Sequence, residues 1–157
     1  MSSAIANFFQ NHYKRTYLVI GASNSPNKFG YKVLRWYIAH KLNVVPINPT
    51  SKKICDLDAF SSVTSYIDSM KGDQEKMKNG ICLSVITPPE VSLTAMQSLK
   101  DYKDLVHGVW FQPGSYDGEV IQYCNDELGF TRANNKLIYN GNCILVSGES
   151  GLVSSNL

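Results

Sequence analysis

The sequence has little excess charge and no long apolar run. Among its 157 residues, 15 are Lys or Arg and 13 are Asp or Glu, which gives a formal net charge of +2. So small an imbalance, with no basic stripe carrying interleaved aromatic residues, does not favour nucleic acid as a partner. No apolar stretch approaches membrane-spanning length. We therefore expect one domain that engages neither nucleic acid nor a membrane.

Metal-binding and secretory signals are also absent. The four cysteines are widely spread and form no C-x-x-C pair, which favours reduced thiols in an intracellular chain: Cys55, Cys82, Cys124 and Cys143. The first 11 residues lack the early basic region and long apolar core of a secretory signal, and the arginine of a transit peptide. These absences predict a cytoplasmic protein without a metal site.

One stretch near the N-terminus organises the rest of the chain. Tyr17–Ile20 is an apolar run typical of a strand buried on both faces, and Gly21 ends it. A polar segment follows from residue 22 to 28, and apolar residues then recur at helical spacing from Gly30 to Ile38. Such a strand, loop and helix direct the helix N-terminus and its unpaired N–H groups at the loop, which suits a phosphate.

Strand and helix signals alternate over the remaining chain. We expect a docking segment over residues 1–15, a main domain over 16–146 and a loose tail over 147–157. The main domain has further strands within 43–48 (ending early because of Pro46), 54–60, 81–86, 107–111 and 136–139, and helices within 60–70, 91–102 and 117–128. Residues 71–80 are polar and read as an exposed connection.

This alternation predicts the fold class. It is α/β: a three-layer, Rossmann-like, doubly wound parallel sheet of five or six strands in a single domain, with the first strand central. Ligands bind such sheets beyond the carboxyl ends of the strands. Four loops should therefore converge on one crevice: residues 21–25, 48–49, 87–89 and 112–114.

The crevice lacks two familiar nucleotide motifs. There is no G-x-G-x-x-G followed by an acidic residue at the end of the second strand, as NAD binding requires, and no G-x-x-x-x-G-K-[ST]. The second strand ends instead in Asn48 and Pro49, with Lys52 and Lys53 close behind. Two ammonium groups there fit a ribose bearing a phosphate, as in NADP or coenzyme A. Two lysines that are merely solvated are the alternative.

A family resemblance rests on four blocks of sequence. They are G-A-S-N-x-P-x-K-F-G-Y-K-V at 21–33, V-x-P-I-N-P at 44–49, T-P-P at 87–89 and V-W-F-Q-P-G at 109–114. Together they resemble the CoA-binding domain proteins, stand-alone relatives of the nucleotide-binding domain in the α subunit of succinyl-CoA synthetase. The resemblance covers residues 16 to about 144. The synthetase's second domain, with its phosphorylated histidine, has no counterpart here, and residues 71–80 look like an insertion.

The resemblance implies a coenzyme A site and its residues. It places Gly21, Ala22, Ser23, Phe29 and Gly30 near the phosphates, with Asn24 and Lys28 in the same loop. It places Asn48, Pro49 and Lys52 at the adenosine end, Thr87, Pro88 and Pro89 on the opposite wall, and Gln112, Pro113 and Gly114 beside the pantetheine. Several of these residues have a purely structural alternative: glycines for tight turns, Ser23 and Asn24 as turn formers, prolines that begin a helix.

We expect the protein to bind coenzyme A or an acyl-CoA. The sequence contains no recognisable catalytic centre. One alternative is an NADP-linked oxidoreductase. Another is acyl or thiol transfer by Cys143, although a buried inert cysteine is the simpler interpretation. His107, which begins a strand, has no partner at triad or metal spacing and is expected to be structural. A homodimer or an unknown protein partner stays open.

Overall fold

Five parallel strands form the centre of the protein. The computed structural model describes residues 3–141 and 143–155. In spatial order the strands are β2 (Val44–Ile47), β1 (Thr16–Ile20), β5 (Ile81–Val85), β6 (Val106–Phe111) and β7 (Leu137–Ile138). Every neighbouring pair is parallel. The predicted Rossmann-like parallel sheet is confirmed, but its central strand is β5, and β1, expected to be central, is second from the β2 edge.

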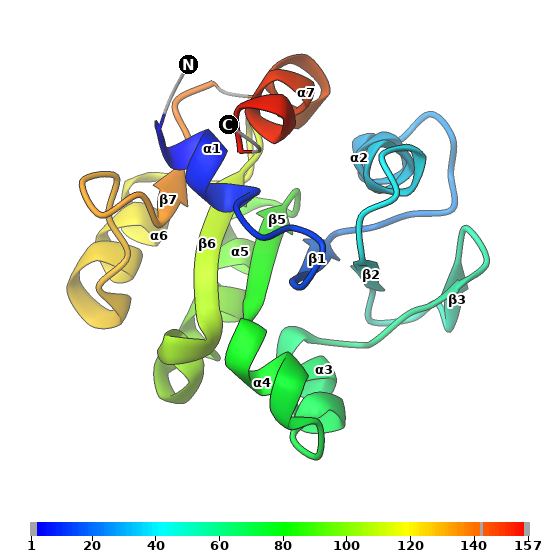
Figure 1. Ribbon diagram of the computed structural model, residues 1–157, viewed down its shortest axis with the longest axis horizontal. Coiled ribbons are helices and arrows are strands. Elements are labelled where there is room, and N and C mark those ends of the chain that lie inside the picture. Colours follow the sequence, from blue (N-terminus) through cyan, green and yellow to red (C-terminus); the bar gives the residue numbers. More distant parts are fainter. Residues whose placement is uncertain (1–2, 142, 156–157) are drawn as a thin grey trace.

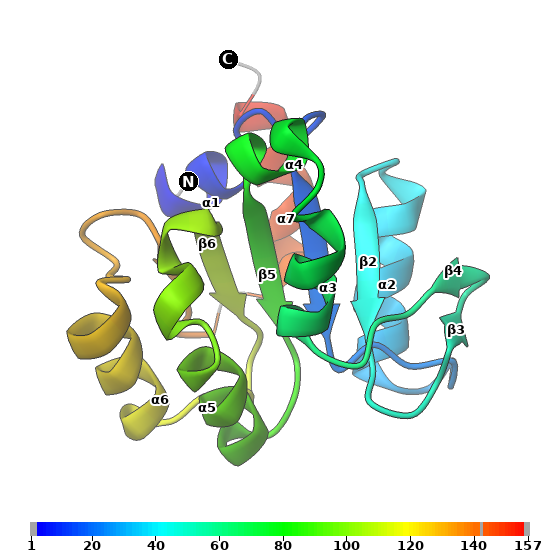
Figure 2. The ribbon, with the colours of Figure 1, turned by 90° about the horizontal axis from the view of Figure 1, so that it is seen from below.

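Helices cover both faces of this sheet, so that it has three layers. One face carries α1 (Ser3–Phe8), α2 (Phe29–Ala39) and α7 (Ile144–Ser154), which Figure 1 shows on one side of the row of strands. The other face carries α3 (Val63–Met70), α4 (Gln74–Asn79), α5 (Pro89–Gln97), the 3₁₀ helix η1 (Lys100–Leu105), α6 (Gly118–Tyr123) and the π-helical turn η2 (Cys124–Leu128). Figure 2 shows α3, α5 and α6 in front of the sheet and α7 behind it.

Strand β2 tolerates Pro46 because it lies at the edge of the sheet. Tyr17 N donates to Asn43 O, and Gly21 N donates to Ile47 O. The backbone N–H and C=O groups of alternate residues of β2 therefore point toward β1, and those of Pro46 point away from it. The Pro46 carbonyl instead accepts a hydrogen bond from Phe60 N. The missing N–H of proline therefore costs no bond to β1, and the strand continues to Ile47 rather than ending early.

The expected strand over 54–60 is instead a separate hairpin. Strands β3 (Lys53–Ile54) and β4 (Leu57–Asp58) pair only with each other, antiparallel, through a two-residue turn. Both turn residues have positive φ, +50° at Cys55 and +65° at Asp56. This is the geometry of a tight hairpin turn, for which Asn-Gly and Asp-Gly are the usual pairs. Asp56 tolerates a positive φ, but Cys55 is not a turn residue, so Cys-Asp does not resemble a turn motif.

The N-terminal segment and the C-terminal helix pack on each other. Phe8 and Phe9 of the N-terminal segment are fully buried, and an added Cβ on Gly151 of α7 would lie 2.2 Å from Ile5 Cγ2. An added Cβ on Gly148 would lie 2.5 Å from Trp36 Cζ2 of α2. The tail from residue 147, expected to be loose, is thus helical to Ser154, because its glycines admit neighbouring side chains. Residues 156 and 157 of that tail lie outside the described chain.

Candidate functional site

The strand register brings the predicted loops to one edge. Ile20 of β1 lies opposite Ile47 of β2 and Val85 of β5, and Val85 lies opposite Phe111 of β6. The residues that follow these four positions therefore emerge side by side at the carboxyl edge. Backbone hydrogen bonds continue into the loops, from Ile86 N to Ile20 O (2.9 Å) and from Gln112 N to Val85 O (3.0 Å).

Two glycines allow the first loop and helix α2 to touch. An added Cβ on Gly30 would lie 2.0 Å from Gly21 O, a distance at which the two backbones collide. Gly21 has a φ of +101°, and its own added Cβ would lie 3.1 Å from Thr87 Cγ2. Gly21 thus contacts both Gly30 and Thr87. A side chain at Gly30 would separate α2 from the end of β1, and one at Gly21 would press against Thr87.

Asn48 joins the second loop to the first. Its Nδ2 donates to Ala22 O (2.9 Å), and its Oδ1 accepts from Thr50 N (2.9 Å) and Ser51 N (3.0 Å). With both ends of the amide engaged, Asn48 fixes the shape of the second loop and ties it to the first. Pro49 lies beside it and lines the pocket described below.

Asn24 holds the β3–β4 hairpin against the first loop. Its Nδ2 donates to Lys53 O (2.9 Å), and its Oδ1 accepts from Cys55 N (3.0 Å). Lys53 itself is paired with Asp58 at 2.9 Å. Lys52, exposed at the base of the hairpin, takes no part in the three ion pairs of the described chain, and neither does Lys28. Both ammonium groups are available to a ligand phosphate.

The N-terminus of α2 is left without a side-chain cap. Lys28 precedes the helix with an extended backbone and makes no capping hydrogen bond, while Ser23 Oγ accepts from Ser25 N and so shapes the turn. The first N–H groups of a helix, here beginning with Phe29 and Gly30, have no partner within the helix. Together with the helix dipole they favour an anion at this end of α2.

A pocket of about 270 Å³ opens on the other face of the sheet at the same edge. Its floor is formed by the ends of β1 and β2 with the residues that follow them, and its two sides come from the start of α3 and one face of α5. The lining is mostly apolar with several hydroxyl groups: Ile20, Gly21, Ile47, Pro49, Ser61, Ser62, Val63, Thr64, Thr87, Val91, Thr94, Ala95 and Ser98. Such a lining suits a flat, uncharged ring better than a phosphate.

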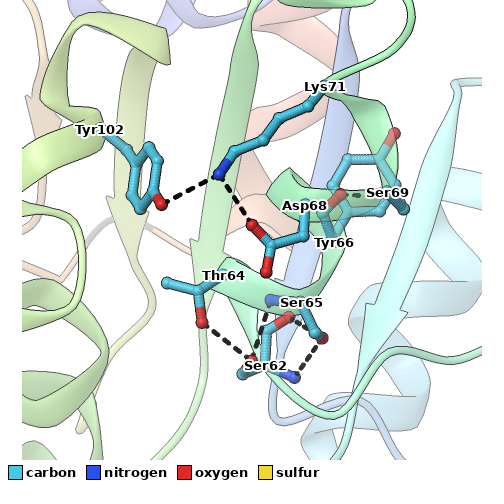
Figure 3. A network of polar contacts seen from close by, with 8 residues as sticks. All are labelled: Ser62, Thr64, Ser65, Tyr66, Asp68, Ser69, Lys71 and Tyr102. Carbon is cyan, nitrogen blue, oxygen red and sulfur yellow. Dashed lines mark hydrogen bonds and ion pairs between the residues drawn. The ribbon is translucent and has the colours of Figure 1, made fainter.

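Helix α3, which borders this pocket, caps its own N-terminus. Figure 3 shows the capping box, in which Ser62 Oγ accepts from Ser65 N (3.1 Å) while Ser62 N donates to Ser65 Oγ (3.1 Å). Thr64 Oγ1 also lies 3.1 Å from Ser62 Oγ. At the other end of the helix, Lys71 contacts Asp68 and Tyr102. With its first turn satisfied internally, α3 is a poorer anion site than α2.

The residues of the third loop begin helix α5. Pro88 is the N-cap and Pro89 the first helical residue. The Thr87 hydroxyl lies 2.9 Å from Ser92 Oγ, and the Ser92 hydroxyl also donates to Thr87 O, so Ser92 fixes Thr87. Of the predicted trio, Thr87 lines the pocket, whereas the two prolines set the direction of α5.

Gln112 is fully buried at the end of β6 and points to α7. Its Oε1 accepts from Ile144 N (2.9 Å) in the first turn of that helix. Its Nε2 has no hydrogen-bond partner among the described residues. A buried donor without a partner costs about 1–3 kcal/mol, which an acceptor on a ligand would recover. The next two predicted residues, Pro113 and Gly114, are exposed, and Gly114 has a φ of +89°.

The cysteines differ in their surroundings. Burial raises the pKa of the Cys82 thiol to about 12, and it raises that of Cys124 to about 12 as well. Cys55 and Cys143 are half-buried, and Cys143 is the N-cap residue of α7. The described residues contain no cluster of three potential metal ligands, and no described helix is long and apolar enough to cross a membrane.

The sequence interpretation missed most of the pocket. It is lined by residues 61–64, which precede and begin α3, and by residues 91, 94, 95 and 98, which lie on one face of α5 and at its C-cap. Neither segment carries a familiar binding motif. The Ser-Ser before an apolar helical pattern signals a helix start at most. Which face of α5 borders the crevice depends on the packing of α3 and α5 on the sheet.

Comparisons with known proteins agree with this geometry. A family model described as CoA binding domain matches residues 15–149. Among solved structures, a conserved hypothetical protein from Pyrococcus furiosus is similar with a TM-score of 0.61 and 24% identity, over 85% of this chain and 98% of that one. A hypothetical protein from Pyrococcus horikoshii OT3 has a TM-score of 0.65 and 19% identity, over 94% and 89%. These structural likenesses concern the fold alone. A search of curated protein sequences found no match.

Proposed function

This chain belongs to the CoA binding domain family, and from that premise we propose that it binds coenzyme A or an acyl-CoA in the crevice at the carboxyl edge of the sheet. The observation that carries the proposal is the pairing of two unlike sites at this edge. The uncapped start of α2 favours an anion, and the pocket between α3 and α5 favours an uncharged ring. A nucleotide with a pyrophosphate needs both.

Each predicted group then has a role in the proposed complex. The N–H groups at the start of α2 receive the pyrophosphate, and the adenine ring enters the pocket beside Val91 and Ala95. Lys28 and Lys52 neutralise the phosphate on the ribose. The pantetheine arm leaves along the loop from Gln112 to Gly114. Recognition of this kind is a binding function and requires no acid–base group.

Calorimetry at one salt concentration tests the proposal with four ligands: coenzyme A, acetyl-CoA, NADP and NAD. We expect both CoA compounds to bind at least about tenfold more tightly than either dinucleotide, a difference of about 1.4 kcal/mol. Tighter binding of NADP than of coenzyme A would favour the oxidoreductase alternative. Failure of all four ligands to bind would refute the proposed function.

Two variants test the two halves of the site. Lys52→Glu reverses a charge near the proposed ribose phosphate, and we expect it to weaken CoA binding at least about tenfold at low salt and less at high salt. Lys103→Glu makes the same change on exposed η1 and should leave binding unchanged.

Ala95→Leu fills the pocket and should abolish binding, whereas Ala39→Leu, at an exposed position of α2, is its matched control. Equal effects of test and control variants would argue against this site.

Thiol or acyl transfer by Cys143 remains an alternative with its own test. Incubation with acyl-CoA followed by mass spectrometry of the intact protein detects acylation. Labelling of the wild-type protein that Cys143→Ser abolishes would support transfer. An unlabelled wild-type protein that binds acyl-CoA would support the binding function.

A further inference from the structure

A second cleft lies at the carboxyl edge, beyond the proposed nucleotide site. It has a volume of about 400 Å³ and is lined by seven residues: Tyr116, Asp117, Gly118, Ile121, Gln122, Asn125 and Tyr139. Tyr116 lies in the loop after β6, and Tyr139 directly follows β7. We call it the tyrosine cleft. Nothing in the proposed recognition of the nucleotide uses it.

Contacts with neighbouring groups hold both rings of the cleft in place. The rings of Tyr116 and Tyr139 lie edge to face with their centroids 5.3 Å apart. Tyr116 Oη accepts a hydrogen bond from Asn140 N (2.9 Å), and the Arg132 guanidinium lies 5.3 Å from the centre of the Tyr139 ring. Both tyrosines are only half-buried, so apolar ring surface is left open beside Ile121. Aromatic walls of this kind suit an apolar or aromatic group.

The topology puts the cleft within reach of the far end of the proposed ligand. Neighbouring strands lie about 4.8 Å apart, so the ends of β6 and β7 are about 10–14 Å from the end of β1. The loop that begins at Gln112, assigned to the pantetheine side, continues directly to Tyr116. An arm that starts at the α2 N-terminus and follows this loop brings its sulfur toward the tyrosines.

The charges near the cleft disfavour an anionic occupant. The Asp117 carboxylate lines the cleft and caps α6 by accepting from Val120 N (3.0 Å), and the Arg132 cation is held over Tyr139. The other polar side chains that line the cleft are uncharged: Tyr116, Gln122, Asn125 and Tyr139. We propose that the tyrosine cleft receives the acyl group of a bound acyl-CoA, and that this group is apolar or aromatic. The proposal rests on the proposed function of the nucleotide site.

The test compares benzoyl-CoA with coenzyme A by calorimetry, and its readout is the ratio of the two affinities. We expect the wild-type protein to bind benzoyl-CoA at least tenfold more tightly. Tyr139→Ala and Ile121→Trp, which remove a wall and fill the cleft, should each bring the ratio within about twofold of unity. Tyr13→Ala changes an exposed tyrosine in the N-terminal segment and should keep the wild-type ratio.

The outcomes separate the two proposals. A wild-type ratio near unity, with coenzyme A bound, would overturn the assignment of the cleft and leave the nucleotide site standing. A high ratio that persists in both cleft variants would also overturn it, because the acyl group would then bind elsewhere. Failure of both compounds to bind would overturn the proposed function and the cleft assignment together.

Discussion

Replacing Gly30 by alanine is the sharpest perturbation of the candidate site. The added methyl group would lie 2.0 Å from Gly21 O and 3.3 Å from Ala22 Cα, and both neighbours are backbone atoms that cannot turn aside. Real Cβ atoms do not approach other heavy atoms closer than about 3.0 Å, so α2 or the loop must move by about 1 Å. That movement displaces the α2 N-terminus from the end of β1.

The expected loss of stability follows from two opposing effects. Overpacking at a tight backbone contact costs about 1–3 kcal/mol, and more where the neighbour is rigid. Alanine in place of glycine in a helix returns up to about 1 kcal/mol. We expect a net loss of about 2 kcal/mol, which for a chain of this length lowers Tm by about 4–8 °C. CoA binding should fall at least tenfold, because a displacement of about 1 Å breaks hydrogen bonds from the loop to phosphate.

Thermal unfolding followed by circular dichroism measures the first effect, and calorimetry with coenzyme A measures the second. Gly72→Ala is the matched control: an added Cβ there meets nothing within 4 Å, and φ is not positive. This control should keep wild-type binding and change stability by no more than about 1 kcal/mol. Wild-type Tm and wild-type affinity in Gly30→Ala would refute the argument that the contact between the two glycines shapes the site.

Three further predictions concern buried groups. Gln112→Met keeps the length of the side chain but removes the unpartnered Nε2 donor together with the acceptor for Ile144 N, so it should weaken CoA binding at least about tenfold in calorimetry. Unchanged affinity would show that no ligand atom uses Nε2. Burial lowers the pKa of His107, so the folded state is destabilised when this side chain becomes protonated, as the pH falls below about 6.5. Urea unfolding should therefore show the wild-type protein losing stability relative to His107→Gln between pH 7 and pH 5. A constant difference in the free energy of unfolding would contradict this. Burial raises the thiol pKa values of Cys82 and Cys124 to about 12, so both should resist a thiol reagent at pH 8 in the folded protein. The half-buried Cys55 and Cys143 should react. Peptide mapping identifies the modified cysteines.

Local patterns predicted the first half of the candidate site. The run from Tyr17 to Ile20, the glycine after it and the helical spacing from Gly30 form one continuous signal, because strand, turn and helix each depend on neighbouring residues. The structure confirms this unit as β1, its loop and α2. The contact between Gly21 and Gly30 explains why glycine stands at both positions.

The missed features depend on residues distant in the sequence. Gly148 and Gly151 resemble loop glycines, but they lie inside α7 because Trp36 and Ile5 occupy the space that their side chains would need. The hairpin turn at Cys55 and Asp56 has positive φ without glycine, and Asn24, 31 residues before Cys55, holds it. Neither feature leaves a periodic pattern in the residues that adopt it.

The distribution of helix caps also has a functional consequence that a motif search does not reveal. Both α2 and α3 begin at the carboxyl edge of the sheet, and both have a positive dipole end there. The Ser62–Ser65 capping box satisfies α3 from within, whereas α2 begins at Lys28 without a cap. A phosphate therefore gains more at α2, and the apolar space beside α3 is left to an uncharged ring. In the proposed complex we therefore expect the phosphates at α2 and the adenine beside α3, with the remaining arm directed toward β6 and the tyrosine cleft.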